Sequence, residues 1–363
     1  MKRRLLTTLI LSWTLFSTYE LSAQNNPYGI KDTLYNYVQK TSDHIGESIG
    51  YKMADTLFAK AKRIKDLNAQ CLALDFKVWH FHKTGQIEKE RLEFKKVAPF
   101  ILKSPYKKYY FSCWNMRINE FIIAHNYPMA INEISKYREK AFALKNNFGI
   151  IESYNMEGGL YYSQEVYRYA LPLYYKALQY AKKTNDREIY RYYKNVSIAA
   201  LRLHRFEEAE KAAKMSIKTA PNNESRIGGY CALLSIFCVK DTDKNVIRKT
   251  YEELEKIDDK VVDKSINKYS RSEAMYNYYE FFLNNKKLAL KEYESGFFNP
   301  DSAIIYKKKK KKYEAEGKLK EAVENYINYC NYIEDKNIKD GDFLLTAFVP
   351  QIDFDNIEFE REA

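Results

Sequence analysis

Glycine and proline are scarce in this chain of 363 residues. The 12 glycines and 8 prolines together reach about half of their usual combined share of roughly 12%. Sandwiches, barrels and folds of alternating strands and helices need a turn residue every few positions, so the scarcity argues against them. Collagen-like and linker-like chains are excluded for a related reason, since both are rich in these residues. We therefore expect an all-α protein, of two or three ordinary domains or one elongated repeat array.

Cysteine is also rare. Five cysteines at irregular spacing do not form a disulfide framework, because such frameworks need an even number. Cys231 and Cys238 are seven residues apart, which on a helix is about 10.5 Å and further than a disulfide permits. We expect the cysteines to be small apolar core residues.

Long apolar runs are lacking except at the start of the chain. Basic residues at 2–4 precede an apolar stretch over 5–19, and small residues at 21–23 follow it. This order is typical of a secretory signal peptide, with cleavage predicted after Ala23. An uncleaved anchor is the alternative, although a membrane span needs roughly 20 apolar residues. We expect residues 1–23 to be a signal peptide and the rest to be periplasmic or otherwise extracytoplasmic.

The chain is rich in tyrosine and carries a net positive charge. There are 33 tyrosines, and a hydrophobic content of 45% excludes disorder as the main state. The formal charge is +12, and it divides into +2 over residues 1–23, +16 over residues 24–333 and −6 over residues 334–363. A basic body attracts acidic partners or anionic membrane surfaces, and secretion argues against nucleic acid. A solvated, lysine-rich surface is the alternative interpretation.

An internal repeat explains where many of the tyrosines fall. One series of residues recurs with spacings of 4, 3, 9, 4 and 3. Steps of three and four keep residues on one helix face, and the step of nine crosses a turn into a second helix. The copies are Tyr154, Gly158, Tyr161, Ala170, Tyr174, Ala177; Tyr193, Ser197, Ala200, Ala209, Ala213, Ser216; Trp114, Ile118, Phe121, Ala130, Ile134, Tyr137; and Tyr306, Lys310, Tyr313, Ala322, Tyr326, Tyr329.

This pattern resembles the tetratricopeptide repeat, whose residues run Trp, Leu-Gly, Tyr, Ala, Phe, Pro over 34 positions. Trp114 stands at the first aromatic position, Gly158 at the glycine, Tyr161 at the tyrosine, Ala170 at the small residue and Pro221 at the final proline. The resemblance implies an α-solenoid over residues 24–337. We expect about eight antiparallel helix pairs in a right-handed superhelix, with a groove lined by the first helices.

The repeats also depart from that family. Their offset of 39 or 40 residues exceeds 34, which longer helices or loops would explain. In the last copy Lys309 and Lys310 replace the Leu-Gly pair. These lysines belong to a run, Lys307–Lys312, which is either a docking patch for acidic groups or a solvated helix whose lysine stems cover apolar surface.

The groove is the predicted binding site. In tetratricopeptide modules the exposed side of the first helix contacts the ligand, so the resemblance implies a protein or peptide partner there. Asparagine can hold an extended peptide backbone, and lysine or arginine can meet a carboxylate. An unoccupied polar surface is the alternative. The matched positions are Asn115, Asn119, Asn155, Tyr162, Arg191, Lys194 and Arg202.

Catalytic and metal-binding patterns are weak. His80 and His82 lie near each other in sequence, but a helix separates them by about 200°, and no third ligand is close in sequence. Two Ser-x-x-Lys matches, at 104–107 and 265–268, lack the companion motifs of penicillin-recognising enzymes. We expect no metal site, no cofactor and no enzymatic activity.

The repeat signature stops after Asn337. Residues 338–363 alternate apolar and acidic side chains, which predicts a cap over the last repeat or a juxtamembrane segment. Together with the signal peptide, the opening residues 26–28 and the degenerate tyrosine-rich repeats, this end resembles the extracytoplasmic sensor regions of bacterial membrane histidine kinases and helix-turn-helix regulators. The resemblance implies a sensor or signalling scaffold, either as part of a longer protein or as a free-standing relative. An aromatic-rich carbohydrate-binding protein and a structural protein of envelope assembly are the alternatives.

Overall fold

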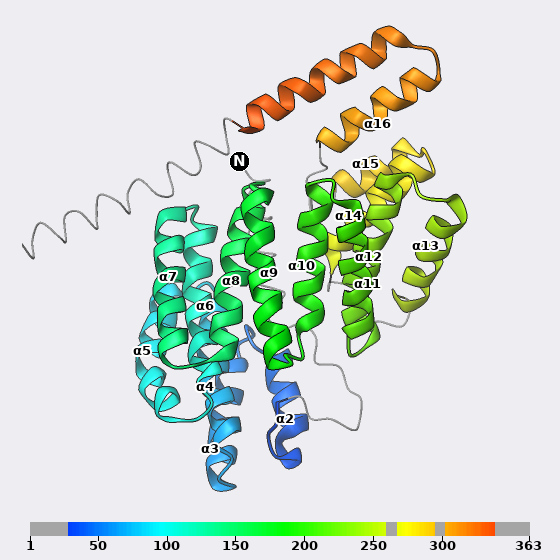
Figure 1. The fold of residues 1–363 in the computed structure, drawn as a ribbon. Helices are drawn as coiled ribbons and strands as arrows, with labels where there is room; N and C mark the ends of the chain where they lie inside the picture. The colour runs from blue at the N-terminus through cyan, green and yellow to red at the C-terminus, as the bar shows by residue number, and fades with distance from the viewer. Residues whose placement is uncertain (1–27, 259–266, 295–301, 338–363) are drawn as a thin grey trace, which may run out of the picture. The chain divides into compact units, whose positions relative to one another are not determined.

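The structure is a computed structural model of the chain, and it describes residues 28–258, 267–294 and 302–337 (Figure 1). This part of the chain consists of helices joined by short turns and contains no strand, which confirms the expected all-α fold. The predicted signal peptide at 1–23 and the predicted C-terminal segment at 338–363 lie outside the described residues. None of the described helices has the length and hydropathy that a membrane span requires.

The described residues form eight helix pairs. The last pair joins α16 to a helix over 319–337. The helices are α2 (Asp32–Asp43), α3 (Gly50–Arg63), α4 (Leu67–Lys83), α5 (Ile87–Lys103), α6 (Lys108–Ile123), α7 (Tyr127–Ala143), α8 (Asn147–Ser163), α9 (Tyr167–Thr184), α10 (Ile189–Arg202), α11 (Phe206–Thr219), α12 (Asn223–Lys240), α13 (Lys244–Asp258), α14 (Lys268–Asn277) with its π-helical continuation η1 (Tyr278–Phe282), α15 (Lys286–Glu294) and α16 (Ser302–Ala315).

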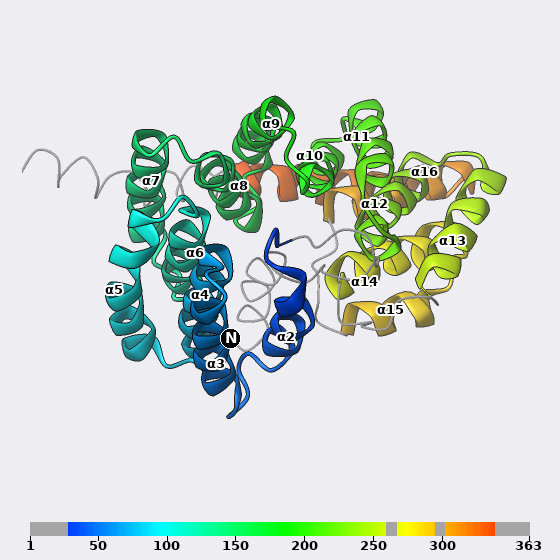
Figure 2. The same ribbon diagram turned by 90° about the horizontal axis from the view of Figure 1, so that it is seen from below.

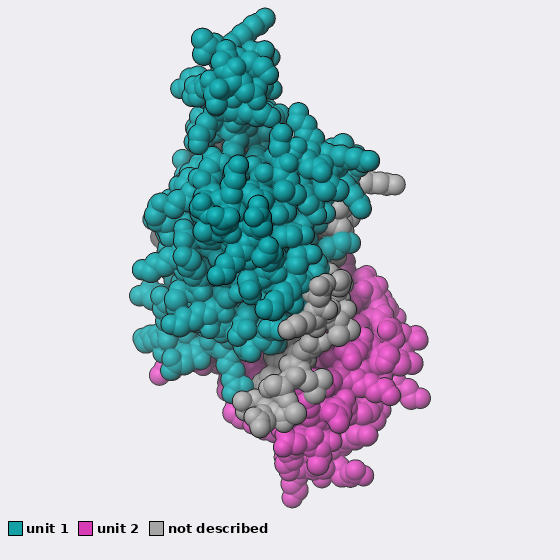
Figure 3. Space-filling view, turned by 90° about the vertical axis from the view of Figure 1, so that its right-hand side faces the viewer, with its two compact units in different colours: residues 1–18, 154–363 teal, residues 19–153 magenta. Residues whose placement is uncertain are grey.

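The chain divides into two compact units (Figure 3). Residues 19–153 form unit 2 and residues from 154 onward belong to unit 1, so the boundary falls inside α8. Within unit 2, α4 packs against α3, α5 and α6; within unit 1, α12 packs against α11, α13 and α14 (Figures 1 and 2). α4 and α12 therefore each contact their own partner helix and the next first helix in the same unit, and this stacking buries the face that a lone pair would expose.

The turns between helices need little glycine. After α3, α6, α7, α8 and α10 the turning residue has a positive φ and is Lys65, His125, Lys145, Glu165 or His204. The next N–H then bonds back to the helix, as Asp66 N does to the Ala61 carbonyl at 2.9 Å, which is the Schellman closure of a helix end. Asp66 also accepts from Ala69 N at 2.9 Å and so caps the following helix. Compact turns of this kind are possible in a sequence with little glycine and proline.

Close approach of the two helices in a pair occurs at the predicted small residues. Ala130, Ala170 and Ala209 are fully buried. At Gly158 even a methyl group would lie 2.8 Å from ring carbons of Tyr174. The recurring aromatic residues Tyr137, Tyr161 and Tyr174 are themselves buried. The register predicted from the repeat is therefore confirmed.

Helix length accounts for the long repeat offset. α4, α5 and α8 have 17 residues each and α9 has 18, while the turns between them stay short. The period therefore exceeds 34 because the helices are long and not because loops are inserted.

The last pair departs from the others. Ala322 is buried as expected, but Tyr326 is 51% exposed, and Leu319, Val323 and Ile327 beside it are exposed too. The prediction of a cap that would cover this face concerns residues 338–363, outside the described part.

Four cysteines behave as the sequence predicts. Cys71, Cys113, Cys231 and Cys238 are buried free thiols, whereas Cys330 is exposed. Burial raises the pKa of Cys231 and of Cys238 to about 12, so these thiols stay protonated and unreactive at neutral pH.

Two lysines with a left-handed backbone conformation, Lys65 and Lys145, allow the turn geometry to be tested by mutation. Lys65 and Lys145 are exposed and hold φ of 57° and 49°, a conformation that costs a side chain about 1 kcal/mol and glycine almost nothing. Lys65→Gly and Lys145→Gly should each raise the free energy of unfolding by up to about 1 kcal/mol in denaturant titrations. Lys140→Gly, inside α7, should lower it by about 1 kcal/mol. Destabilisation by all three would contradict the turn assignment.

Candidate functional site

A row of hydrogen-bonded polar side chains links the first helices of unit 1. Asn195 Nδ2 of α10 donates to Asn155 Oδ1 of α8 at 2.7 Å. About two helical turns further along the same two helices, Arg202 of α10 forms a hydrogen bond with Tyr162 of α8. We call Asn155, Tyr162, Lys194, Asn195, Arg202 and Glu273 the unit 1 polar row.

Arg202 joins three helices. Its Nη2 donates to Glu273 Oε1 of α14 at 2.5 Å, and its Nε donates to Tyr162 Oη of α8 at 3.4 Å. The residue is 8% exposed. A buried guanidinium held by a carboxylate is a structural tie, because loss of either partner leaves an uncompensated charge in the interior.

Lys194 is in a different situation on the same helix. Its aliphatic stem lies along α12, where a methyl group on Gly228 would be 3.0 Å from Lys194 Cδ. Burial, followed by the nearby charge of Arg191, lowers the pKa of the Lys194 ammonium to about 8. No carboxylate of the described residues forms an ion pair with it. Arg191 itself lies 3.8 Å from Glu188.

The predicted groove residues therefore separate into two groups. Asn155, Tyr162 and Arg202 take part in the hydrogen bonds of the row. Lys194 and Arg191 lie on the same helix as Arg202, and the Lys194 stem packs against α12. Asn115 and Asn119 lie on α6 in unit 2, where both are buried. Asn115 is 1% exposed, and neither its amide oxygen nor its nitrogen has a hydrogen-bond partner among the described residues. It belongs to the interior rather than to an exposed helix face.

Asn195 was missed by the sequence reasoning. It stands 40 residues after Asn155 and 80 after Asn115, which is the offset of the repeat. The recurrence of one polar residue type at the repeat spacing is the signal that would have identified it.

The tyrosines of the two central repeat copies, over 154–177 and 193–216, do not form a ligand platform. Tyr161, Tyr174 and Tyr193 are buried, and Tyr154 stacks on Tyr180 with 5.8 Å between ring centroids. A carbohydrate-binding protein needs aromatic faces open to solvent, so the structure gives that alternative no support at these positions.

The lysine run holds α16 on the C-terminal end of α12. Lys308 Nζ donates to the Cys238 carbonyl at 2.6 Å and to the Asp241 carboxylate, and Lys311 Nζ reaches the same carboxylate at 3.1 Å. Carbonyls at a helix C-terminus attract cations. Burial lowers the pKa of Lys308, although Asp241 opposes that shift. Lys308 also lies over the Phe281 ring at 5.1 Å, so its stem covers apolar surface.

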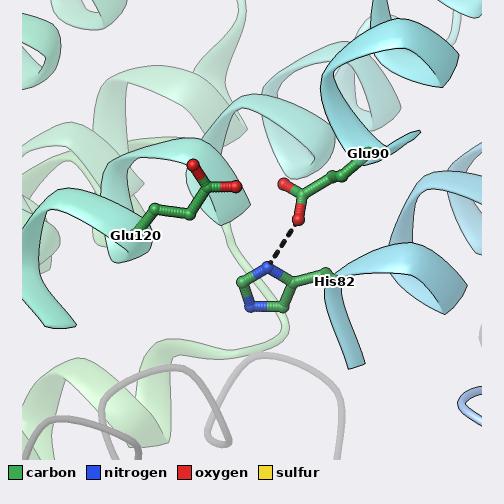
Figure 4. Close-up of side chains that lie close together, drawn as sticks. All are labelled: His82, Glu90 and Glu120. Atoms are coloured by element: carbon green, nitrogen blue, oxygen red, sulfur yellow. Dashed lines mark hydrogen bonds and ion pairs between the residues drawn. The ribbon is translucent and has the colours of Figure 1, made fainter. Parts of the chain in front are cut away.

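A second polar cluster lies in unit 2, on three successive helices (Figure 4). His82 comes from the end of α4, Glu90 from the start of α5 and Glu120 from the end of α6. His82 Nδ1 is 3.0 Å from Glu90 Oε2, and one ligand atom from each residue lies within 4.8 Å of the others.

Glu120 is the residue of this cluster whose hydrogen bonds are incomplete. Its side chain is 9% exposed, and its Oε2 accepts from Arg91 Nη2 at 3.1 Å. The other oxygen, Oε1, is buried without a hydrogen-bond partner among the described residues. Burial and the adjacent Glu90 carboxylate raise the pKa of Glu120 to about 7. A histidine and two carboxylates in this arrangement could hold a metal ion.

The sequence could not assemble this cluster from local spacing. Glu90 and Glu120 follow His82 by 8 and 38 residues, and only the packing of α4 against α5 and α6 brings them together. The one available signal is that 38 is close to the repeat offset, which places His82 and Glu120 near the same end of consecutive first helices.

The helices and their contacts define an all-α protein of tetratricopeptide-like helix pairs. No family model matches the chain, and no curated protein matches it. Among solved structures, it is similar to a Rap protein complexed with competence and sporulation factor, at 11% identity and a TM-score of 0.49, with 92% of each chain covered.

Two further solved structures show weaker similarity. The apo form of RapI matches at 12% identity and a TM-score of 0.40, covering 84% of this chain and 99% of that one. BtubC from P. vanneervenii matches at 13% identity and a TM-score of 0.35, covering 74% of this chain and 94% of that one. The fold assignment therefore rests on the helix pairs themselves.

The lysine anchor can be tested with two adjacent residues. Lys308→Gln should increase amide exchange over 302–315, because α16 loses its bonds to the Cys238 carbonyl and to Asp241. Lys309→Gln removes the same charge from an exposed neighbour and should leave the exchange unchanged. Equal exchange in the two variants, measured by mass spectrometry, would show that charge alone and not this anchor holds the helix.

Proposed function

We propose that this chain is a non-enzymatic repeat protein that binds a protein or peptide partner on the unit 1 polar row. The partner presents a carboxylate to Lys194. The observation that carries the proposal is Lys194 itself, a desolvated ammonium with a pKa of about 8 and no ion pair among the described residues. Burial disfavours a charge unless an opposite charge accompanies it, and an acidic ligand group supplies that charge.

The neighbouring amides suit an extended peptide. Asn195 uses one N–H for Asn155, and an asparagine side chain has two donor protons and an acceptor oxygen. The remaining groups of Asn195 can pair with a peptide backbone while Lys194, one residue earlier, meets the carboxylate. Charge and backbone contacts next to each other favour a peptide or protein segment over a small inorganic anion.

We further propose that the protein acts outside the cytoplasm as a sensor or signalling scaffold. The N-terminal residue pattern at 1–23 and the resemblance of the whole chain to extracytoplasmic sensor regions support this role. A ligand can shift a conformational equilibrium only through unequal affinity for the two states. Arg202 connects α10, which carries Lys194, to α8 and α14, so a ligand at Lys194 acts on a helix that is tied to two others.

Lys194→Gln tests the binding role directly. An array of extended peptides bearing Asp, Glu or a free C-terminal carboxylate would be compared with the same peptides as amides. Acidic peptides should bind preferentially, and Lys194→Gln should lower their affinity by roughly ten- to hundredfold, since a charge-assisted hydrogen bond contributes about 1.5–3 kcal/mol. Lys183→Gln, an exposed lysine of the same unit, is the matched control. Binding by Lys194→Gln that equals binding by this control would refute the assignment.

Arg202→Gln should behave differently from Lys194→Gln. It leaves Glu273 buried without its cation, so the free energy of unfolding should fall by about 3 kcal/mol or more. Lys194→Gln should keep or raise stability, because it removes a half-buried charge that has no ion pair among the described residues. Thermal and denaturant unfolding separate these two effects from the binding result.

The affinity for an acidic peptide should also depend on pH. Because the pKa of Lys194 in the free protein is about 8, the ammonium is charged at pH 7 and loses its proton as the pH rises above 8. A bound carboxylate stabilises the charged form, so affinity should fall between pH 8 and pH 9.5, whereas Lys194→Gln should show no such fall. The measurement needs a peptide without groups that titrate in this range.

A further inference from the structure

The cluster in unit 2 has three features of a built site. Its ligand atoms come from three different helices, all three side chains are mostly shielded from water, and two of them are carboxylates that repel each other. Arg91 offsets part of this repulsion through Glu120 Oε2. The remaining oxygen, Glu120 Oε1, lies buried without a partner among the residues that the structure describes.

We propose that His82, Glu90 and Glu120 bind a divalent transition-metal ion of the Zn²⁺ type. The site belongs to unit 2 and is independent of the binding role proposed for the unit 1 polar row.

The donor set selects the kind of ion. Imidazole nitrogen suits Zn²⁺, Cu²⁺, Fe²⁺ and Ni²⁺, whereas Mg²⁺ and Ca²⁺ prefer shells made only of oxygen. One histidine and two carboxylates give three protein ligands, and a zinc ion with three protein ligands keeps a fourth position for water or for a ligand from another molecule. The ion would therefore fasten α4, α5 and α6 together and still offer one open coordination position.

The distances are compatible with such an ion after a small movement. Metal–ligand bonds of about 2.0–2.2 Å place tetrahedral donor atoms about 3.4 Å apart. His82 Nδ1 and Glu90 Oε2 are already 3.0 Å apart. No two ligand atoms of the cluster are more than 4.8 Å apart, so a shift of at most about 1.4 Å by a glutamate side chain completes the shell.

The surrounding side chains hold the ligands in place. Arg91 Nη2 fixes one oxygen of Glu120 at 3.1 Å and so orients the other. The Trp79 ring stacks on the His82 imidazole, with 5.9 Å between centroids. Outer contacts of this kind set the orientation of metal ligands.

A metal-free cluster is the competing explanation. In that case protons on His82 or between Glu90 and Glu120 neutralise the charges, and the residues form a buried polar contact only. The same variants distinguish the two explanations, because removal of one carboxylate relieves repulsion in both cases but abolishes metal affinity only if a metal site exists.

The test uses the full chain without a histidine tag, stripped of metal with a chelator. Zn²⁺ is titrated in competition with a chromogenic chelator, and Co²⁺ is added separately to follow its visible spectrum and the quenching of Trp79 emission. Wild-type protein should bind one Zn²⁺ per chain, and Glu120→Gln and His82→Gln should each weaken it by at least about tenfold. His44→Gln should bind as the wild type does, because His44 and Glu47 form an exposed pair at 2.7 Å without a third ligand.

Stability supplies the second readout. Without metal, Glu120→Gln should melt at or above the wild-type temperature, since the crowding of two carboxylates is gone. Added Zn²⁺ should raise the melting temperature of the wild type and of His44→Gln but not of Glu120→Gln. Absence of Zn²⁺ binding would overturn the proposal in favour of the proton-neutralised cluster. Equal binding by wild type and Glu120→Gln would also overturn it and assign the ion to thiols such as the exposed Cys330.

Discussion

The close approach of two antiparallel helices at a small residue is the contact on which the other features of this molecule depend. At Gly158 of α8 there is no room for a methyl group against the Tyr174 ring of α9. On the second helix of this pair and of two others, the small residues Ala170, Ala130 and Ala209 are fully buried. A helix pair closed in this way has a flat apolar face, which the next pair must cover. The stacking of successive pairs and the burial of the aromatic residues Tyr137, Tyr161 and Tyr174 follow from that requirement.

The close approach of the helices also determines which residue types are buried and which are left to bind a partner. Tyrosine rings fill the space beside the small residues, so Tyr137, Tyr161 and Tyr174 pack inside the units and are not presented to a ligand. The first helices still carry polar side chains. Some of these side chains pair with each other and stabilise the fold, as Arg202 and Glu273 do. Others, such as Lys194, have no ion pair among the described residues. In the binding role that we propose, recognition depends on the few polar groups that the stacking does not satisfy.

The sequence predicts the architecture better than it predicts the sites. Spacing alone put Ala170, Ala209 and Ala322 at the small position of a second helix, because that position follows from helical periodicity, and all three are buried. It also named Asn155, Tyr162 and Arg202, which take part in the hydrogen bonds of one row, and Lys194 on the same helix as Arg202. It could not tell that Arg202 is engaged by Glu273, 71 residues later, or that Asn115 is buried. The sequence also could not predict the cluster of His82, Glu90 and Glu120, because contacts between helices far apart in sequence depend on how the pairs stack. The role of Lys308 was equally hidden, because its partners at Cys238 and Asp241 are about 70 residues away.

The central claim is that the tyrosine surplus is architectural, and nitration of the native protein followed by peptide mass mapping tests it most directly. Exposed rings such as Tyr169 and Tyr326, which are 43% and 51% exposed, should be modified first. Tyr137, Tyr161 and Tyr174 should react only after the protein unfolds, because each ring is buried in its helix pair. Modification of Tyr161 and Tyr174 in the native protein at the rate of Tyr169 would contradict the claim and restore the aromatic surface as a candidate binding site.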